Sequence, residues 1–141
     1  MKDGILQVLT EKEELERLRG SESLLHLLID SLPAFVSYID SDQRYVFANA
    51  LYAAFFQRKL SEIIGRSVKE VLGDEVYETV RTHIQAALNG LRQNYQYELP
   101  HLGKTRIIRA LYVPHIEKGK VKGLFILGID LTNGNGNGKT T

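Results

Sequence analysis

The fold is decided by the stretch Gln93–Thr132, which reads QNYQYELPHLGKTRIIRALYVPHIEKGKVKGLFILGIDLT. It contains three β-prone segments, which are Gln93–Leu99, Thr105–Val113 and Val121–Ile129. The separators, Pro100–Gly103 and Pro114–Lys120, have the length of hairpin links and contain turn-forming residues. This arrangement predicts three antiparallel strands joined by hairpins.

The last of these segments differs from the other two in its hydrophobic pattern. Its central run is Gly123–Ile129, GLFILGI, which is apolar at consecutive positions. A strand without alternation is typically buried on both faces. We therefore expect this strand in the middle of the sheet, with helices on one side and another apolar helix or a partner on the other.

A second pair of short β-prone runs lies earlier in the chain. These runs are Phe35–Ile39 and Arg44–Ala48, and the residues between them, Asp40–Gln43, favour a turn by their side-chain chemistry. Two short strands joined by a tight polar turn form a hairpin.

Helical spacing replaces strand spacing between the two β regions. The pattern predicts a short helix over Asn49–Phe56 and capped turns over Ser61–Gly65 and Ser67–Leu72. A longer helix is expected from about Asp74, with an apolar stripe on one face, until Asn89 and Gly90 end it.

The N-terminal residues 1–22 are expected to form a helix ahead of a domain over 23–132, and residues 133–141 a flexible Asn-Gly tail. Pro33 should end the helical segment at about Ser31. A heptad frame over this segment predicts a coiled-coil homodimer, whereas a single amphipathic helix packed on its own domain explains the same leucines equally well. The residues expected in the dimer seam are Leu15, Leu18, Leu25, Ile29 and Leu32.

The composition excludes several classes of protein. The net charge is +1 and no run of basic residues is present, which disfavours nucleic-acid binding. The absence of cysteine fits a reducing compartment and excludes thiolate chemistry. No apolar stretch approaches the ~20 residues of a membrane span, and acidic residues at 11, 13 and 14 argue against a signal peptide. The sequence therefore indicates a cytoplasmic domain without membrane contact of its own.

Four short motifs in this order resemble the PAS domain family of bacterial signal-transduction proteins, such as sensor histidine kinases and diguanylate cyclases. They are Asp40–Asn49 at the first hairpin, Ile64–Val68 before the long helix, Gly119–Gly123 at the last turn, and Asp130–Thr132 at the end. The resemblance runs from about Ser23 to Thr132.

The resemblance implies an α+β fold, in which a five-stranded antiparallel sheet and the short helices on one face enclose a small cavity for a ligand or cofactor. It also implies that N-terminal helices pair between protomers. Asp130 and Thr132 would then couple the sheet to an output domain such as a kinase or cyclase. An Asn-Gly tail stands where the family has an output helix.

Polar and aromatic side chains within apolar surroundings are the candidate ligand contacts. The alternative for Phe55 and Phe56 is that they fill a core. Arg109 is either an outward strand charge or an inward cation that awaits a carboxylate. The set is Ser37, Tyr38, Asn49, Tyr52, Phe55, Phe56 and Arg109.

Cofactors and catalysis are less favoured. Flavin and thioester chromophores that bind covalently through cysteine are excluded, while haem could use His83 on the long helix, although a structural histidine at the core edge is the favoured interpretation. His101 and His115 lie at opposite ends of a predicted strand and should not share a metal ion. No catalytic motif is present. We therefore expect a non-enzymatic module that either senses a small ligand or serves as a ligand-free dimerisation and relay domain.

Overall fold

The computed structural model describes residues 12–13, 20, 24 and 27–134 of the 141-residue chain. Residue contacts divide the chain into two units, Met1–Leu32 and Pro33–Thr141. Residues 27–31 are helical, and their helix ends where Pro33 predicts. The predicted seam residues Leu15, Leu18 and Leu25 lie outside the described residues. Ile29 is half-buried and Leu32 is exposed.

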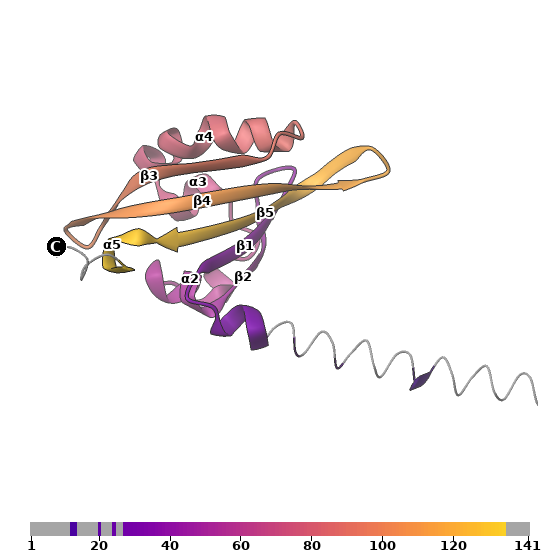
Figure 1. The fold of residues 1–141 in the computed structure, drawn as a ribbon, viewed down its shortest axis with the longest axis horizontal. Coiled ribbons are helices and arrows are strands. Elements are labelled where there is room, and N and C mark those ends of the chain that lie inside the picture. The colour runs from indigo at the N-terminus through magenta and orange to yellow at the C-terminus, as the bar shows by residue number, and fades with distance from the viewer. Residues whose placement is uncertain (1–11, 14–19, 21–23, 25–26, 135–141) are drawn as a thin grey trace, which may run out of the picture. The chain divides into compact units, whose positions relative to one another are not determined.

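The second unit contains one five-stranded antiparallel sheet with the spatial order β2-β1-β5-β4-β3. Figure 1 shows β5 at the centre of the sheet, between β1 and β4, as the sequence predicts. The strands are β1 (Phe35–Asp40), β2 (Tyr45–Ala48), β3 (Gln93–His101), β4 (Lys104–Glu117) and β5 (Lys120–Asp130).

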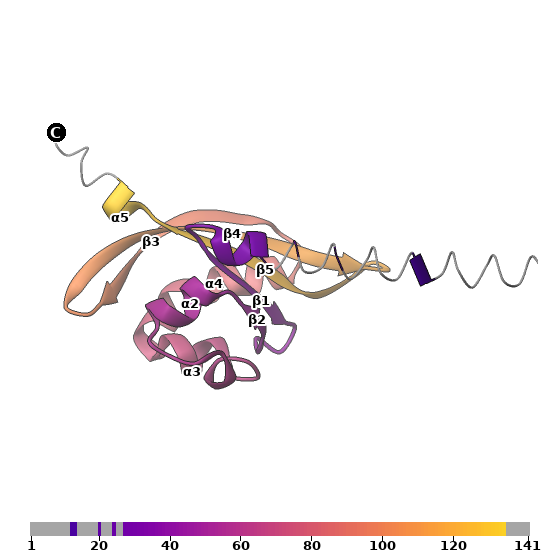
Figure 2. The same cartoon turned by 90° about the horizontal axis from the view of Figure 1, so that it is seen from below.

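The helices between β2 and β3 lie on one side of this sheet (Figure 2). Ser67 forms the predicted cap of α3, as a capping box with Glu70, and the Asn49 side chain caps α2, where the sequence predicts only a helix start. The turn predicted at Ser61–Gly65 overlaps a short 3₁₀ helix that begins at Leu60, with Lys59 rather than Ser61 at the cap position. The elements are α2 (Ala50–Phe55), η1 (Leu60–Glu62), α3 (Val68–Leu72) and α4 (Asp74–Leu88), and a short α5 (Leu131–Gly134) follows β5.

The two C-terminal hairpins are tighter than the sequence predicts. Each turn has two residues at positive φ: Leu102 and Gly103 at 51° and 78°, and Lys118 and Gly119 at 51° and 78°. Such turns match the right-handed twist of paired strands. The strands therefore extend through most of the predicted separators.

Both prolines in those separators lie within strands, where the sequence predicts links. Pro100 is tolerated because β3 is an edge strand. Pro114 is tolerated because β3 pairs with β4 only as far as Tyr112, so no β3 residue faces Pro114 across the ladder. The sequence predicts a strand break at each proline, whereas in the sheet each proline occupies a position with one neighbouring strand.

The expectation that β5 is buried on both faces is wrong for the described chain. Leu124 and Gly128 are buried, but Phe125 is 50% exposed and Ile129 is 39% exposed. The two sets alternate because successive side chains of a strand point to opposite faces. The helices cover one face, here called the inner face, and the opposite face is called the outer face.

The main core lies between the inner face and the helices. Ile39 and Leu124 from the sheet and Ile63 and Ile84 from the helical layer are fully buried there. The apolar stripe predicted for the long helix supplies Val76, Val80, Ile84 and Ala87 to this side of the domain. Burial of these side chains is the main source of stability for such a layered domain.

A candidate ligand cavity

The inner face and the helices enclose a small cavity of about 50 Å³. All five strands and the helices α2, α3 and α4 contribute residues to its wall. Aromatic rings make up almost half of the lining. The lining residues are Phe35, Tyr45, Tyr52, Phe55, Phe56, Val68, Leu72, Ile84, Tyr97, Leu99, Ile108, Ala110, Tyr112, Ile126 and Gly128.

Two pairs of tyrosines are hydrogen-bonded through their hydroxyl groups around this cavity. Tyr45 bonds Tyr52, and Tyr95 bonds Tyr112 at 2.6 Å. Burial raises the pKa of all four phenols, well above the ordinary value in the cases of Tyr52 and Tyr112. The pairs are therefore neutral over the physiological pH range.

Tyr97 differs from those four tyrosines. Burial raises its pKa to about 12, but its hydroxyl has no hydrogen-bond partner within the described part of the chain. Its side chain lines both the cavity and a neighbouring groove. The other groove residues, from α4, β3 and the start of β4, are Glu75, Val76, Thr79, Gln96, Glu98, Pro100 and Thr105. Tyr97 thus separates the buried cavity from a groove whose other residues are mostly exposed.

Charged side chains are absent from the cavity lining among the described residues. The hydroxyl groups of Tyr45, Tyr52, Tyr97 and Tyr112 are the polar side-chain groups of the wall. The cavity can therefore offer a ligand aromatic surface and hydrogen bonds, but no counter-charge.

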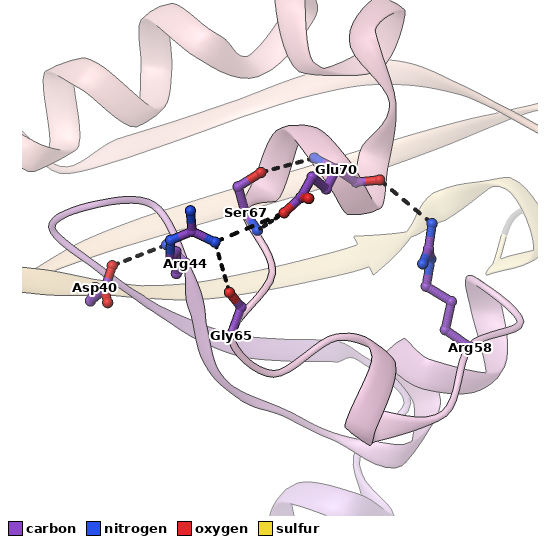
Figure 3. Close-up of polar contacts among 6 residues, drawn as sticks. All are labelled: Asp40, Arg44, Arg58, Gly65, Ser67 and Glu70. Atoms are coloured by element: carbon purple, nitrogen blue, oxygen red, sulfur yellow. Dashed lines mark hydrogen bonds and ion pairs between the residues drawn. The ribbon is translucent and has the colours of Figure 1, made fainter.

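A network of polar contacts holds the α3 wall of the cavity against the first hairpin (Figure 3). The Arg44 guanidinium donates to the Gly65 carbonyl at 2.9 Å and lies 3.9 Å from the Glu70 carboxylate. Hydrogen bonds from Ser67 lower the pKa of Glu70. The backbone of Tyr45 also accepts from Gly65 and donates to Arg66. These contacts fix the segment that leads into Val68 and Leu72.

Three of the predicted ligand contacts line the cavity: Tyr52, Phe55 and Phe56. The structure does not separate the core-filling role of the two phenylalanines from a binding role, because both rings also pack in the core clusters. Phe55 is stacked on His101 at 3.7 Å, and His101 Nε2 bonds the Phe55 carbonyl oxygen at 2.6 Å. This contact joins α2 to the edge strand β3.

Asn49 and Ser37 are buried on the inner side but are absent from the lining. Asn49 Oδ1 accepts from the backbone N–H groups of Val36 and Tyr52, and its Nδ2 donates to the Ala34 carbonyl. The Asn49 side chain therefore joins β1 to the start of α2. The Ser37 hydroxyl is buried without a hydrogen-bond partner among the described residues.

Tyr38 and Arg109 lie on the outer face, so the expectation that they contact a ligand in the cavity is corrected. Tyr38 is bonded to His115 Nδ1 at 2.6 Å and packs against Phe125. Arg109 is exposed and donates to Asn94 Oδ1 at 2.8 Å. Of the two alternatives for Arg109, the outward charge is the one observed, since parity places its side chain opposite that of Ala110.

His83 lies outside the cavity lining, at the edge of the interface between α4 and β3. Its ring stacks on Tyr95 at 3.5 Å and its Nδ1 lies 2.8 Å from Gln93 Oε1. This placement agrees with the interpretation of His83 as a structural histidine at the edge of the core. Within the described residues no cluster of three or more His, Asp or Glu side chains could hold a metal ion.

Asp130 and Thr132 form a compact junction where β5 ends. Asp130 Oδ1 accepts from the Thr132 N–H at 2.9 Å, and Asp130 Oδ2 lies 3.4 Å from the Arg106 guanidinium. Thr132 Oγ1 accepts from the Ile107 N–H at 2.7 Å. These contacts tie the residues after β5 to β4.

Sequence reasoning missed Tyr45, Tyr97 and Tyr112 as cavity residues. A usable signal was present in β3, where tyrosine or leucine recurs at every second position over Tyr95–Leu99.

No helix of the described residues is long and apolar enough to cross a membrane.

Comparison with known proteins gives consistent matches. A sequence model described as the PAS fold matches residues 29–134. "Probable histidine kinase 1" of Oryza sativa subsp. indica is 24% identical over 132 residues, a match that covers 91% of this chain and 13% of that protein. The chain thus spans a small part of this curated relative.

Solved structures share the fold at low sequence identity. The PAS domain of Bordetella pertussis BvgS has a TM-score of 0.68 and 20% identity, with 89% of this chain and 96% of that chain covered. The PAS domain of an HTR-like protein from Haloarcula marismortui has a TM-score of 0.63 and 22% identity, with 84% and 98% covered.

Proposed function

Because the chain belongs to the PAS fold family, whose members are sensory modules without catalysis of their own, we propose that it senses a small ligand in the cavity. Occupancy would be relayed along β5 to an output segment. The observation that carries this proposal is a short path within one strand. Ile126 and Gly128 line the cavity, and Asp130 and Thr132 form the junction at the end of the same strand.

A ligand can shift a conformational equilibrium only if it binds one state more tightly than the other. In this fold the two states would differ in the position of β5 and its junction with β4. The Asp130–Arg106 ion pair and the Thr132–Ile107 hydrogen bond are the contacts that such a movement would change. Both ionic side chains are largely buried, which makes the pair sensitive to small displacements.

The relation to a histidine kinase suggests the output. We propose that the full-length parent is a sensor histidine kinase and that this module regulates its kinase domain.

The N-terminal helix would pair with that of a second copy through Leu15, Leu18, Leu25, Ile29 and Leu32. Light scattering should show weaker self-association for Leu18→Asp combined with Leu25→Asp, and an unchanged dimer would contradict this pairing.

The second candidate function is a ligand-free relay module, which the small volume of the cavity favours. Pockets for drug-sized ligands have volumes of ~300–1,000 Å³, whereas this cavity has about 50 Å³. In the relay alternative the aromatic side chains complete the core and the signal enters through the N-terminal helix.

A binding screen and a signalling assay separate the two candidates. Amide chemical shifts of the isolated domain should respond saturably to one or more compounds of a small-fragment library, near Ile126 and Gly128. Indifference to the whole library would favour the relay alternative. We propose no haem ligation by His83, because its ring is already stacked and bonded; a Soret band in the absorption spectrum of purified protein would contradict this.

The coupling role of Asp130 is tested in the full-length parent. Asp130→Ala removes an ion pair and the bond to the Thr132 N–H, so we expect a folded domain whose ligand no longer alters autophosphorylation. Arg81→Ala is the matched control, since it removes the ion pair with Glu78 on α4, and neither of these residues lines the cavity. A normal response in Asp130→Ala would count against the junction as the relay.

A further inference from the structure

The size of the cavity limits what it can hold. A buried water needs ~10–15 Å³ of this kind of space, so 50 Å³ accommodates about three to five water molecules. This is the space of a ligand with a few heavy atoms, such as one small planar ring. The rings of Phe35, Phe55 and Phe56 in the wall provide flat apolar surface for such a ligand.

The wall also limits the charge of the ligand. A buried ion is costly unless an opposite charge or several hydrogen bonds compensate it. The described lining contains no charged side chain, and burial keeps its phenols protonated. Arg109, the cation that the sequence offered as a carboxylate partner, is exposed on the outer face. A charged ligand would therefore be desolvated without compensation.

The Tyr97 hydroxyl differs from the other phenols of the wall in its hydrogen bonding. Tyr45 shares one hydrogen bond with Tyr52, and Tyr112 shares one with Tyr95. The Tyr97 hydroxyl makes no such bond in the described part of the chain, and its side chain borders the groove through which a ligand could reach the cavity. A phenol can donate one hydrogen bond and accept others.

We infer that the cavity selects small, uncharged ligands that form a hydrogen bond with the Tyr97 hydroxyl. The ligand enters past this side chain from the groove between α4 and β3. This rests on the proposed sensing function and adds the chemical class of the ligand. Small neutral heterocycles and amides fit this class. Carboxylates and ammonium compounds do not.

Three aromatic rings of equal size test the charge selectivity. At mildly acidic pH pyrazole is neutral, imidazole is mostly a cation and tetrazole is mostly an anion. Each is titrated into the isotope-labelled domain and followed by amide chemical shifts. We expect saturable shifts at Ala110 and Gly128 with pyrazole and none there with the two ions. Comparable binding of either ion would overturn the charge selectivity while leaving a ligand sensor in place.

Two tyrosine variants test the hydrogen bond. Tyr97→Phe should weaken pyrazole binding about two- to tenfold, the loss expected for one hydrogen bond. Tyr77→Phe is the matched control: its hydroxyl donates to Gln43 Oε1 and its side chain is absent from the cavity lining, so binding should be unchanged. Equal affinity of Tyr97→Phe and the wild type would remove Tyr97 from the site.

A filled cavity gives the remaining control. Ala110→Val places two additional carbon atoms at a buried lining position, so it should abolish the pyrazole shifts in a domain that still gives a folded spectrum. Persisting shifts would locate binding elsewhere on the surface. Failure of all three rings and of the whole fragment library would instead contradict the sensing function itself.

Discussion

The two faces of the sheet are built from the same strands but have different chemistry. On β5, Leu124 is fully buried on the inner face, while Phe125, the next residue, is half-exposed on the outer face. Ser37 and Tyr38 on β1, and Ala110 and Arg109 on β4, repeat this contrast. The comparison shows that strand parity, rather than residue type, assigns each side chain to the inner or to the outer face.

The cavity lining on the inner face is neutral and rich in tyrosine, whereas the outer face carries charged and imidazole groups such as Arg109 and His115. His115, for example, is bonded to Tyr38 and lies 3.4 Å from the Glu117 carboxylate. The same face holds Arg109 with Asn94 and Gln96. A neutral cavity and a polar outer surface can therefore respond to different chemical signals.

The largest expected effect of this contrast is a loss of folding free energy at alkaline pH. In the unfolded chain tyrosine ionises near its ordinary pKa of 10.0, whereas burial raises the pKa of Tyr97 to about 12. The stability of the fold with a neutral, buried Tyr97 is fully present below pH 10.0 and is lost as the pH rises toward 12. The loss is about 1.4 kcal/mol per pH unit for each such tyrosine, and Tyr45, Tyr52, Tyr95 and Tyr112 shift in the same direction.

Urea unfolding at a series of alkaline pH values measures this loss. Tyr97→Phe should make the decline shallower by the contribution of one tyrosine. Tyr38→Phe should change the slope less, because Tyr38 lies on the outer face and burial raises its pKa by a smaller amount. An equal change in the two variants would show that the faces do not differ as described.

The next effect compares adjacent positions of β5. Leu124→Ala removes a fully buried side chain of the core and should lower the free energy of unfolding by about 2–5 kcal/mol. Phe125→Ala on the outer face should cost about 1 kcal/mol, since half of its side chain is already exposed. Chemical denaturation measures both. A cost for Phe125→Ala equal to that of Leu124→Ala would mean that another segment covers the outer face.

The smallest effects on stability are expected for substitutions at the adjacent β1 residues Ser37 and Tyr38. The two effects should differ in sign. The Ser37 hydroxyl is buried without a partner among the described residues, so Ser37→Ala should be neutral or stabilising by up to about 1 kcal/mol. Tyr38→Phe removes the hydrogen bond to His115 and should destabilise the domain by about 0.5–1 kcal/mol. Clear destabilisation by Ser37→Ala would reveal a hydrogen bond to an ordered water.

Most of the fold could be predicted because its local signals agree with one another. The helix start at Asn49, the cap at Ser67, the stop at Asn89 and Gly90, and the spacing of the β-prone segments each appear where the structure has a boundary. The continuation of β3 through Pro100 and of β4 through Pro114 could not be predicted from the sequence. Whether a proline breaks a strand depends on how many neighbours that strand has, and neighbours are set by the sheet.

The sequence by itself determined the order of the elements and the absence of thiolate chemistry, because these follow from periodicity and residue type. It also predicted the central place of β5, although the burial on both faces from which this was inferred is not observed. It also offered Tyr52, Phe55 and Phe56 as ligand contacts, and these three line the cavity. The tertiary structure decided which face each strand residue occupies. Closure of the sheet over α2, α3 and α4 brings Tyr45, Tyr97 and Tyr112 to one cavity and excludes Arg109 from it, since these residues are distant along the chain and meet only when all five strands are paired.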